Sequence, residues 1–274
     1  MANKIVFVLK NPGKTLRFIK RKASNVVRFW GLKLGLMKRS FRVVSLPGGF
    51  SFKARNSTSD GDGIVIKEVW SENVYHVEAG DIRDGSVVFD LGANIGVFSN
   101  LAASMVRCDV YSFEPQPENF GMFLENIELN KNLVKGVIHP INKAVSVSDG
   151  TIDLFVDVED GGVSSTTKPV GKAVKVACVS LENFMKENKI ASVDFMKIDI
   201  EGGEYDILFS LPKPILDKIK KVALEYHNVP FREEYNADAL LTFFGNNGFK
   251  TIHEPDKKME DGSVSENRLI IAYK

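Results

Sequence analysis

The clearest pattern along the chain begins after Gly85, where short apolar runs alternate with segments whose apolar residues recur every three or four positions. Such runs are typical of buried parallel strands, and such spacing is typical of amphipathic helices that cover a sheet. The pattern predicts strands at residues 87–91, 110–113, 137–141, 193–198 and 221–225. The expected fold class is therefore α/β, with a doubly wound and mostly parallel sheet.

Helices are expected between these strands. Apolar residues at helical spacing follow residue 95, Pro117 and Glu201, and recur at 239–244. Two further pairs of runs, 152–156 with 174–179 and 249–252 with 269–273, alternate as antiparallel pairs do. The polar loops inside these pairs, 161–167 and 254–267, are the expected source of acceptor specificity, because loops carry most binding differences.

The region before the alternation has a different pattern. Short β-like runs at 41–46 and 63–69 are separated by stretches rich in glycine and polar residues, which predicts a small β-meander. We therefore expect a basic helical N-terminal segment at 1–40, a β-rich lead-in at 41–84 and a Rossmann-like domain at 85–274.

Charge is distributed unevenly. The net charge is +1, yet no Asp or Glu precedes Asp60, whereas Lys and Arg recur from Lys4 to Arg55. Apolar residues interleaved with this charge suit a helix that packs on the domain or lies on anionic lipid. Nucleic-acid binding is not expected, because no recognition motif accompanies the basic stretch.

The apolar run in this segment and the two cysteines of the chain indicate where the protein is expected to be located. The apolar run at 5–9 is too short to span a bilayer, and no secretion signal follows it. Cys108 and Cys178 are too few for a disulfide framework, so they are expected in the core of a protein from a reducing compartment. The expected location is cytoplasmic, with contact to the membrane periphery through the basic segment as an extension.

A glycine-rich loop follows the first predicted strand, at Asp90-Leu91-Gly92-Ala93-Asn94-Ile95-Gly96. Glycines let the backbone turn tightly and approach a ligand, and the first strand of such a sheet is the usual nucleotide position. Glu114 lies about twenty residues further on, at the end of the second strand, where a carboxylate accepts hydrogen bonds from ribose hydroxyls. Together these features predict an adenosine-containing ligand.

Charge favours one such ligand. Asp90 would repel the pyrophosphate of a dinucleotide but would suit the ammonium or sulfonium of S-adenosyl-L-methionine. Asp90 could alternatively cap the helix or hold the loop. An NAD-dependent oxidoreductase or epimerase predicts a Gly-x-Gly-x-x-Gly turn and a catalytic Tyr and Lys pair, and neither is evident.

A charged block at 194–204 ends the fourth predicted strand. Alternation along a strand places Lys197 and Asp199 on one face, with Glu201 just beyond. This cluster could hold the cofactor amine, orient an acceptor, bind a cation or form a structural salt bridge.

These motifs, in this order, resemble the FkbM family of S-adenosylmethionine-dependent methyltransferases. The resemblance spans roughly residues 57–226 and rests on 87–96, 113–115, 142–146, 180–184 and the Lys-Ile-Asp-Ile-Glu-Gly run from Lys197. It implies a class I methyltransferase fold with a seven-stranded sheet and O-methylation of a hydroxyl on a sugar, glycan or natural product. By position it implies a set of cofactor-binding residues: Asp90, Gly92, Ala93, Asn94, Gly96, Glu114, Pro115, Asn142 and Ala144.

Methyl transfer to a hydroxyl also needs a group that removes the proton. His227 is the first candidate because its ordinary pKa suits a base near neutrality, followed by Asp199 and Glu201, with Lys197 as a further catalytic candidate. Asp199, Glu201, Glu225 and His227 could alternatively hold a divalent cation, although we expect no metal.

The acceptor is expected to be a small molecule or glycan, with a lipid-linked form as an extension. A binding module that contacts the membrane through its basic helix and has lost its chemistry is the alternative from another class.

Overall fold

The protein is described here from a computed structural model. The structure describes residues 40–56, 60–156, 164–165, 172–227, 229, 232–254, 257–258, 264–265 and 268–274. The predicted basic helical segment, apart from Ser40, and most of the two predicted specificity loops lie outside the described residues. No helix within the described ranges is both long enough and apolar enough to span a bilayer.

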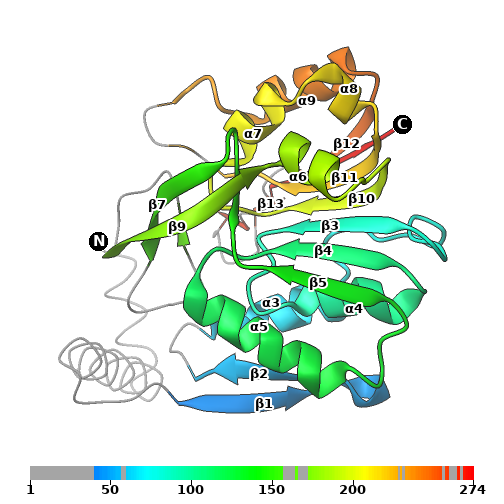
Figure 1. Ribbon diagram of the computed structural model, residues 1–274, viewed down its shortest axis with the longest axis vertical. Coiled ribbons are helices and arrows are strands. Elements are labelled where there is room, and N and C mark those ends of the chain that lie inside the picture. Colours follow the sequence, from blue (N-terminus) through cyan, green and yellow to red (C-terminus); the bar gives the residue numbers. More distant parts are fainter. Residues whose placement is uncertain are drawn as a thin grey trace.

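A seven-stranded sheet forms the centre of the molecule, in the order β12-β15-β11-β10-β3-β4-β5 (Figure 1). Its parallel strands are β3 (Val87–Leu91), β4 (Asp109–Phe113), β5 (Val137–Ile141), β10 (Val193–Ile198) and β11 (Ile219–Glu225). β15 (Leu269–Tyr273) runs antiparallel to both β11 and β12 (Lys250–Glu254). The α/β fold class, the five predicted parallel strands and the terminal antiparallel pair are confirmed.

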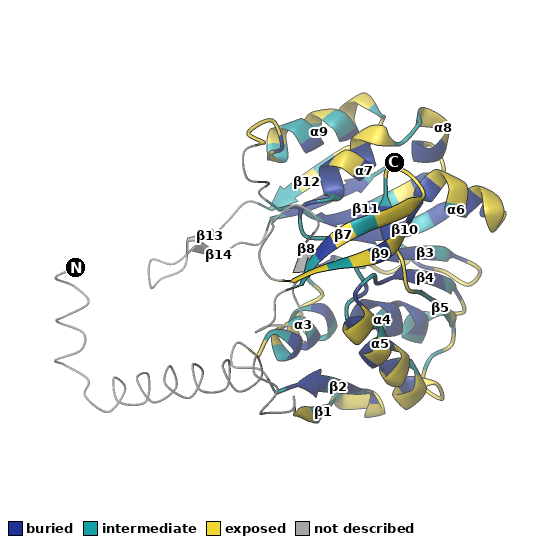
Figure 2. Ribbon diagram, turned by 60° about the vertical axis from the view of Figure 1, so that its left-hand side comes forward, coloured by how far each residue is buried: buried dark blue, intermediate teal, exposed yellow. Residues whose placement is uncertain are grey.

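Helices cover both faces of this sheet, and Figure 2 shows the central strands buried between them. On one face lie α3 (Gly61–Trp70), α4 (Val97–Met105) and α5 (Pro117–Asn130). On the other lie α6 (Leu181–Glu187), α7 (Glu204–Ser210), α8 (Lys213–Leu216) and α9 (Ala237–Asn246). The helices predicted after residue 95, after Pro117, after Glu201 and at 239–244 are confirmed, whereas the pattern did not predict α3, α6 or α8.

Alternation along the strands assigns each side chain to one of the two helical layers. In β3, Phe89 packs with the layer of α6, α7 and α9, whereas Val88 packs with the layer of α3 and α4. Asp90 therefore projects toward the α3 and α4 face. Lys197 pairs in register with Asp90 on the neighbouring parallel strand, so it projects toward the same face. The sheet thus buries two opposite charges side by side.

The lead-in departs from its predicted pattern. β1 (Phe41–Ser45) and β2 (Ser51–Arg55) form an antiparallel hairpin around the short 3-10 turn η1 (Pro47–Gly49). The strand predicted at 63–69 is wrong, and the β-meander with it, because these residues belong to α3. Asp62, Ile66 and Val69 are the buried residues of α3, and their spacing places them on one helical face. Packing of that face against α4 overrides the β propensity of its valines and isoleucines.

Two asparagines attach the hairpin to the domain. The side chain of Asn126 accepts from the backbone N–H of Lys53 at 2.7 Å and donates to its carbonyl at 3.3 Å. Asn130 makes the same pair of bonds with Ser51, at 2.9 Å each. Both side chains come from α5 and are fully buried. They satisfy backbone groups of β2 that a third strand would otherwise pair.

A smaller sheet extends beside the carboxyl ends of the central strands (Figure 1). It has the order β6-β9-β7-β8, and it contains the predicted antiparallel pair as β7 (Gly150–Val156) and β9 (Lys172–Ser180). β6 (Ala144–Ser146) and β8 (Ser164–Ser165) were not predicted. A separate short pair joins β13 (Lys257–Lys258) to β14 (Val264–Ser265).

Candidate active site

The site lies where the strand order reverses. From β3 the chain proceeds outward to β4 and β5, whereas β10 and β11 continue from β3 in the other direction. Ligands of open α/β sheets bind in the crevice at such a point. Here the loop after β3 meets the residues after β10, and the N–H of Asp199 donates to the carbonyl of Leu91 at 3.0 Å.

The glycine loop adopts backbone conformations that its sequence permits. Gly92, Asn94 and Gly96 all have positive φ angles, of 83°, 52° and 84°. A Cβ at Gly92 would overlap the backbone oxygen of Asp199, so glycine lets these two segments meet. A Cβ at Gly96 would instead overlap the ring of Phe123 on α5. Gly96 therefore serves helix packing and does not line the cavity, although both glycines were predicted to surround the cofactor.

A buried ion pair lies beneath this loop. The Nζ of Lys197 is 3.4 Å from Oδ1 of Asp90 and donates to the carbonyl of Gly92 at 2.6 Å. Ser99 donates to the other oxygen of Asp90 at 2.6 Å, whereas Oδ1 has no hydrogen-bond partner among the residues that the structure describes. Burial raises the pKa of Asp90, although Lys197 and Ser99 oppose that shift. Burial alone would lower the pKa of Lys197, but the charges of Asp199, Asp90 and Glu225 outweigh it and raise the pKa.

Glu114 ends β4 and faces the loop with both oxygens. Oε2 accepts from the N–H of Asn94 and Oε1 from the N–H of Gln116, each at 2.8 Å. Burial raises the pKa of Glu114 to about 7, although these two hydrogen bonds lower it. Each carboxylate oxygen retains a second lone pair for a hydroxyl donor. Asn142 donates to the carbonyls of Glu114 and Pro115, at 2.8 and 3.3 Å, so it holds this turn.

One cavity of about 230 Å³ opens along this edge of the sheet. We call one side of it the cofactor wall and define it by five predicted residues: Gly92, Asn94, Glu114, Pro115 and Ala144. We call the other side the acid wall and define it by Asp199, Glu201 and Glu225. Among the predicted site residues, Asp90, Ala93, Gly96, Asn142, Lys197 and His227 do not line this cavity.

The cofactor wall fits an adenosine ligand that carries a cationic amino acid. The Oδ1 atom of Asn94, which lines the cavity, is buried without a hydrogen-bond partner in the described part of the chain. Buried polar atoms of this kind normally have partners, so a bound group with N–H donors would complete them. Phe113, Val145 and Leu154 supply apolar lining next to Glu114.

Behind the acid wall, His227 lies among three carboxylates. Its Nδ1 is 2.5 Å from Oε1 of Glu204, and its Nε2 is 3.7 Å from Glu201 and 4.0 Å from Asp199. Burial lowers the pKa of His227, but the hydrogen bond to Glu204 and the surrounding negative charge outweigh it and raise the pKa to about 10. In the ligand-free protein, His227 is therefore an imidazolium near neutral pH and cannot accept a proton there.

Tyr75 and Glu225 complete this region. The hydroxyl of Tyr75 donates to Oδ2 of Asp199 at 3.0 Å, and its ring lies 5.3 Å from the Nζ of Lys197. Burial and the nearby charge of Asp199 raise the pKa of Glu225 to about 8. Burial raises the pKa of Asp199, but the nearby charges of Lys197 and His227 lower it by more. The pKa of Asp199 is therefore below its ordinary value.

Sequence reasoning did not assign roles to Tyr75, Glu68 or Glu204. Glu68 lines the cavity from α3, which the pattern had assigned to a strand. The helical spacing of Asp62, Ile66 and Val69 was the signal that could have revealed it. No periodic signal marks Glu204, because its importance follows from contact with His227, which lies 23 positions away.

The sheet order, the glycine loop at the reversal point and the carboxylate after β4 define a class I S-adenosylmethionine-dependent methyltransferase. A family model described as the methyltransferase FkbM domain matches residues 90–251. The chain therefore belongs to the FkbM methyltransferase family, and its cofactor is S-adenosyl-L-methionine. This decides between the adenosine ligands that the glycine loop alone leaves open.

Curated relatives are distant in sequence. The chain is 24% identical to the 31-O-demethyl-FK506 methyltransferase FkbM of Streptomyces tacrolimicus, over 70% of this chain and 83% of that protein. It is 21% identical to the hexuronic acid methyltransferase AglP of Haloferax volcanii, over 59% of this chain and 67% of that protein. It also matches the AMB antimetabolite synthetase AmbE of Pseudomonas aeruginosa at 25% identity, over 81% of this chain, and spans only 12% of the length of that protein.

Solved structures with similar folds include a SAM-dependent methyltransferase from Agrobacterium tumefaciens. It shares 15% identity and has a TM-score of 0.45, with 87% of this chain and 71% of that chain covered. An rRNA methylase from Streptococcus thermophilus shares 14% identity and has a TM-score of 0.43, with 74% of this chain and 93% of that chain covered.

Proposed function

We propose that this methyltransferase transfers the methyl group to a hydroxyl oxygen of a sugar, glycan or natural product. The observation that carries this proposal is the acid wall, which lines the same cavity as the cofactor wall. S-adenosyl-L-methionine supplies the methyl group when bound. An acceptor hydroxyl must lose its proton as its oxygen is methylated, and carboxylates placed there can accept that proton.

The relatives support this acceptor class. One is named for O-methylation at a position of FK506, and another is named for hexuronic acid. Both names describe small molecules or sugars. A lipid-linked acceptor and membrane contact through residues 1–40 remain predictions, and liposome flotation of the full chain against a chain beginning at Phe41 tests the membrane contact.

The proton acceptor in this proposal is Glu201 or Asp199. His227 was the first candidate, but three carboxylates hold it as an imidazolium in the ligand-free protein. In the ligand-free protein, we therefore assign His227 a positioning role and not the role of proton acceptor. Lys197 contacts both Asp90 and Asp199, so it joins the two walls and holds the cofactor loop.

Incubation of the purified protein with methyl-labelled cofactor and a panel of hydroxylated glycans, uronic acids and polyketides tests the proposal. We expect label on an acceptor oxygen, located by mass spectrometry and NMR, with loss of turnover in Glu201→Gln or Asp199→Asn. Label found on nitrogen or carbon would contradict O-methylation. Full turnover in His227→Ala would remove His227 from any role in the reaction.

A further inference from the structure

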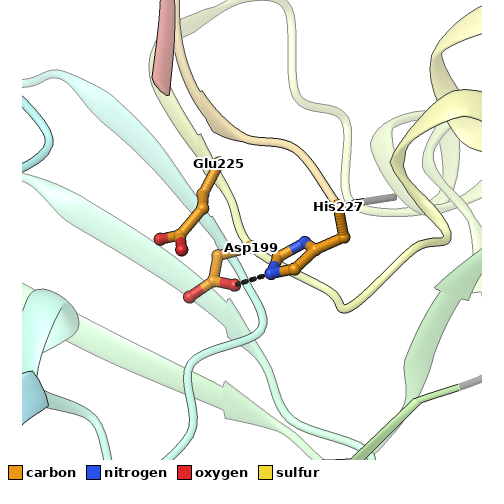
Figure 3. Close-up of side chains that lie close together, drawn as sticks. All are labelled: Asp199, Glu225 and His227. Atoms are coloured by element: carbon orange, nitrogen blue, oxygen red, sulfur yellow. Dashed lines mark ion pairs between the residues drawn. The ribbon is translucent and has the colours of Figure 1, made fainter. Parts of the chain in front are cut away.

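Three side chains of the acid wall and its surroundings converge on one point (Figure 3). Asp199 follows β10, Glu225 ends β11 and His227 lies two residues beyond. One ligand atom from each lies within 4.8 Å of the other two. We propose that Asp199, Glu225 and His227 bind a divalent cation that in turn binds the acceptor hydroxyl. This inference rests on the proposed function for its role, but its binding test does not.

The orientation of His227 suits a ligand. A metal-binding histidine usually presents one ring nitrogen to the metal and donates the other N–H to a carboxylate or carbonyl. His227 has this arrangement, because Nδ1 contacts Glu204 at 2.5 Å while Nε2 faces Asp199 and Glu201. The cation would displace a proton from Nε2, as metal binding to imidazole generally does.

Glu204 gives a second, independent indication. Its side chain is fully buried and directed at His227, yet its Oε2 has no hydrogen-bond partner in the described part of the chain. A buried carboxylate with an unsatisfied oxygen is costly unless nearby positive charge compensates it. The imidazolium of His227 supplies such charge in the ligand-free protein, and a divalent cation on the far side of the ring would supply it once the proton on Nε2 is displaced.

The charges around Glu225 are also unbalanced. No described side chain donates a hydrogen bond to Glu225 or lies within ion-pair distance of it, although it faces the cavity. The nearest cations are already engaged, since Lys197 contacts Asp90 and Asp199 while His227 contacts Glu204. Four carboxylates therefore gather here: Asp199, Glu201, Glu204 and Glu225. A cation between Asp199 and Glu225 would relieve their repulsion.

The ligand set narrows the choice of metal. Two carboxylates and one imidazole form a mixed oxygen and nitrogen set, and Oδ1 of Asp199 remains for the cation because Tyr75 donates to Oδ2. Carboxylates favour magnesium and manganese, whereas imidazole extends the range toward zinc and iron. Mn²⁺ is therefore the appropriate probe.

The proposed cation would assist deprotonation of the acceptor. A hydroxyl bound to a divalent cation has a lower pKa, as a metal-bound water does. Its O–H bond would then break with the proton passing to the carboxylate of Glu201, and the oxygen would keep the electron pair that forms the new bond to the methyl carbon. The bond between that carbon and the sulfonium sulfur would break at the same time, and its electron pair would stay on sulfur, which leaves as a neutral thioether. No oxidant or reductant takes part.

Titration of the full chain with Mn²⁺, followed by loss of the free Mn²⁺ signal in electron paramagnetic resonance, tests the site directly. We expect one saturable Mn²⁺ per chain, and at least tenfold weaker binding in Glu225→Gln and His227→Gln. The matched control is Asp109→Asn, which removes an acid 2.7 Å from His139 at another edge of the sheet and should leave Mn²⁺ binding unchanged. Wild-type Mn²⁺ affinity in Glu225→Gln and His227→Gln would overturn the proposal.

Glu204→Gln separates a ligand-orienting role from simple packing, because the amide has nearly the same shape. Loss of a carboxylate behind a metal-binding histidine typically lowers metal affinity by about 10–100-fold. We expect that loss with an unchanged circular dichroism spectrum and unchanged cofactor affinity. Unaltered Mn²⁺ affinity in Glu204→Gln would contradict the arrangement proposed for His227.

Calorimetry with S-adenosyl-L-methionine, with and without a chelator, distinguishes failure of this inference from failure of the proposed function. Cofactor binding and hydroxyl methylation that persist unchanged under chelation, without Mn²⁺ binding, overturn the cation site and leave the proposed function intact. Mn²⁺ binding without methylation of any hydroxyl retains the site and overturns the proposed function.

Discussion

The two walls of the cavity are built by different means. The cofactor wall comes mainly from the residues just after β3 and β4, together with Ala144 at the start of β6, and backbone atoms and glycines shape much of it. The acid wall comes from the ends of β10 and β11, and charged side chains whose partners lie far along the chain shape it. The first wall therefore depends on backbone conformation, and the second depends on charge balance. Each prediction below tests one side of this comparison.

The largest effect is expected where the two walls meet, at Lys197. Lys197→Met leaves Asp90 fully buried without its cation, and such losses cost about 3–5 kcal/mol of unfolding free energy. The control is Lys220→Met, which removes an exposed lysine paired with Asp194 and should cost at most about 1 kcal/mol. Urea unfolding of both variants measures the difference, and equal losses would mean that burial of the Lys197 pair is unimportant.

The second effect tests the backbone of the cofactor wall. Gly92→Ala would push the loop away from Asp199, because the added Cβ overlaps its carbonyl oxygen and φ is 83°. We expect a cost at the upper end of the ~1–3 kcal/mol typical of overpacking, together with loss of cofactor binding in calorimetry. Gly121→Ala, on α5 with open space around it, serves as the control and should bind normally. Normal cofactor binding by Gly92→Ala would refute the close approach.

The third effect is a pH dependence that belongs to Glu114. Its pKa of about 7 means that ribose hydroxyls meet an ionised acceptor above that pH and a protonated one below it. Cofactor affinity should therefore fall as the pH drops from 8 to 6, by at most about tenfold per pH unit. The dependence should disappear in Glu114→Gln and persist in Glu182→Gln, an exposed acid on α6. Calorimetry across this range measures it.

The same shift has a separate consequence for stability. Between the ordinary pKa of 4.5 and about 7, the folded state holds a proton that the unfolded state has already lost. The contribution of Glu114 to the stability of the cofactor-free protein is therefore full below 4.5 and is lost as the pH rises through about 7. Comparison of urea midpoints for the wild type and Glu114→Gln at pH 5 and 8 checks this sign.

The smallest effect concerns the acid wall alone. Tyr75→Phe removes the hydroxyl that donates to Asp199 at 3.0 Å but keeps the ring that packs against Phe98. We expect the free energy of unfolding to fall by only about 0.5–1.5 kcal/mol, because the Asp199 side chain is partly exposed and water can replace the hydroxyl. Turnover should fall while cofactor affinity stays unchanged. A change in cofactor affinity without a change in turnover would place Tyr75 with the cofactor wall.

Local sequence was enough to predict the residues of the cofactor wall, since a strand, a glycine turn and an acid after the next strand are contiguous signals, and their roles toward the cofactor stay predictions. It also predicted the sheet, because buried parallel strands produce long apolar runs. It failed at α3, where valine and isoleucine favour a strand but Asp62, Ile66 and Val69 pack as one helical face. Its assignment of Gly96 to the cofactor stays a prediction, and the structure adds that a Cβ at this position would meet the ring of Phe123.

The sequence by itself determined the fold class, the family and the position of the glycine loop, because each follows from short patterns of spacing and residue type. Only the tertiary structure decided what the charged residues do. It placed Lys197 between Asp90 and Asp199, held His227 against Glu204 and left Glu225 without a hydrogen-bond or ion-pair partner in the described part of the chain. The protonation of such groups depends on burial and on neighbours distant along the chain, and no local pattern records either.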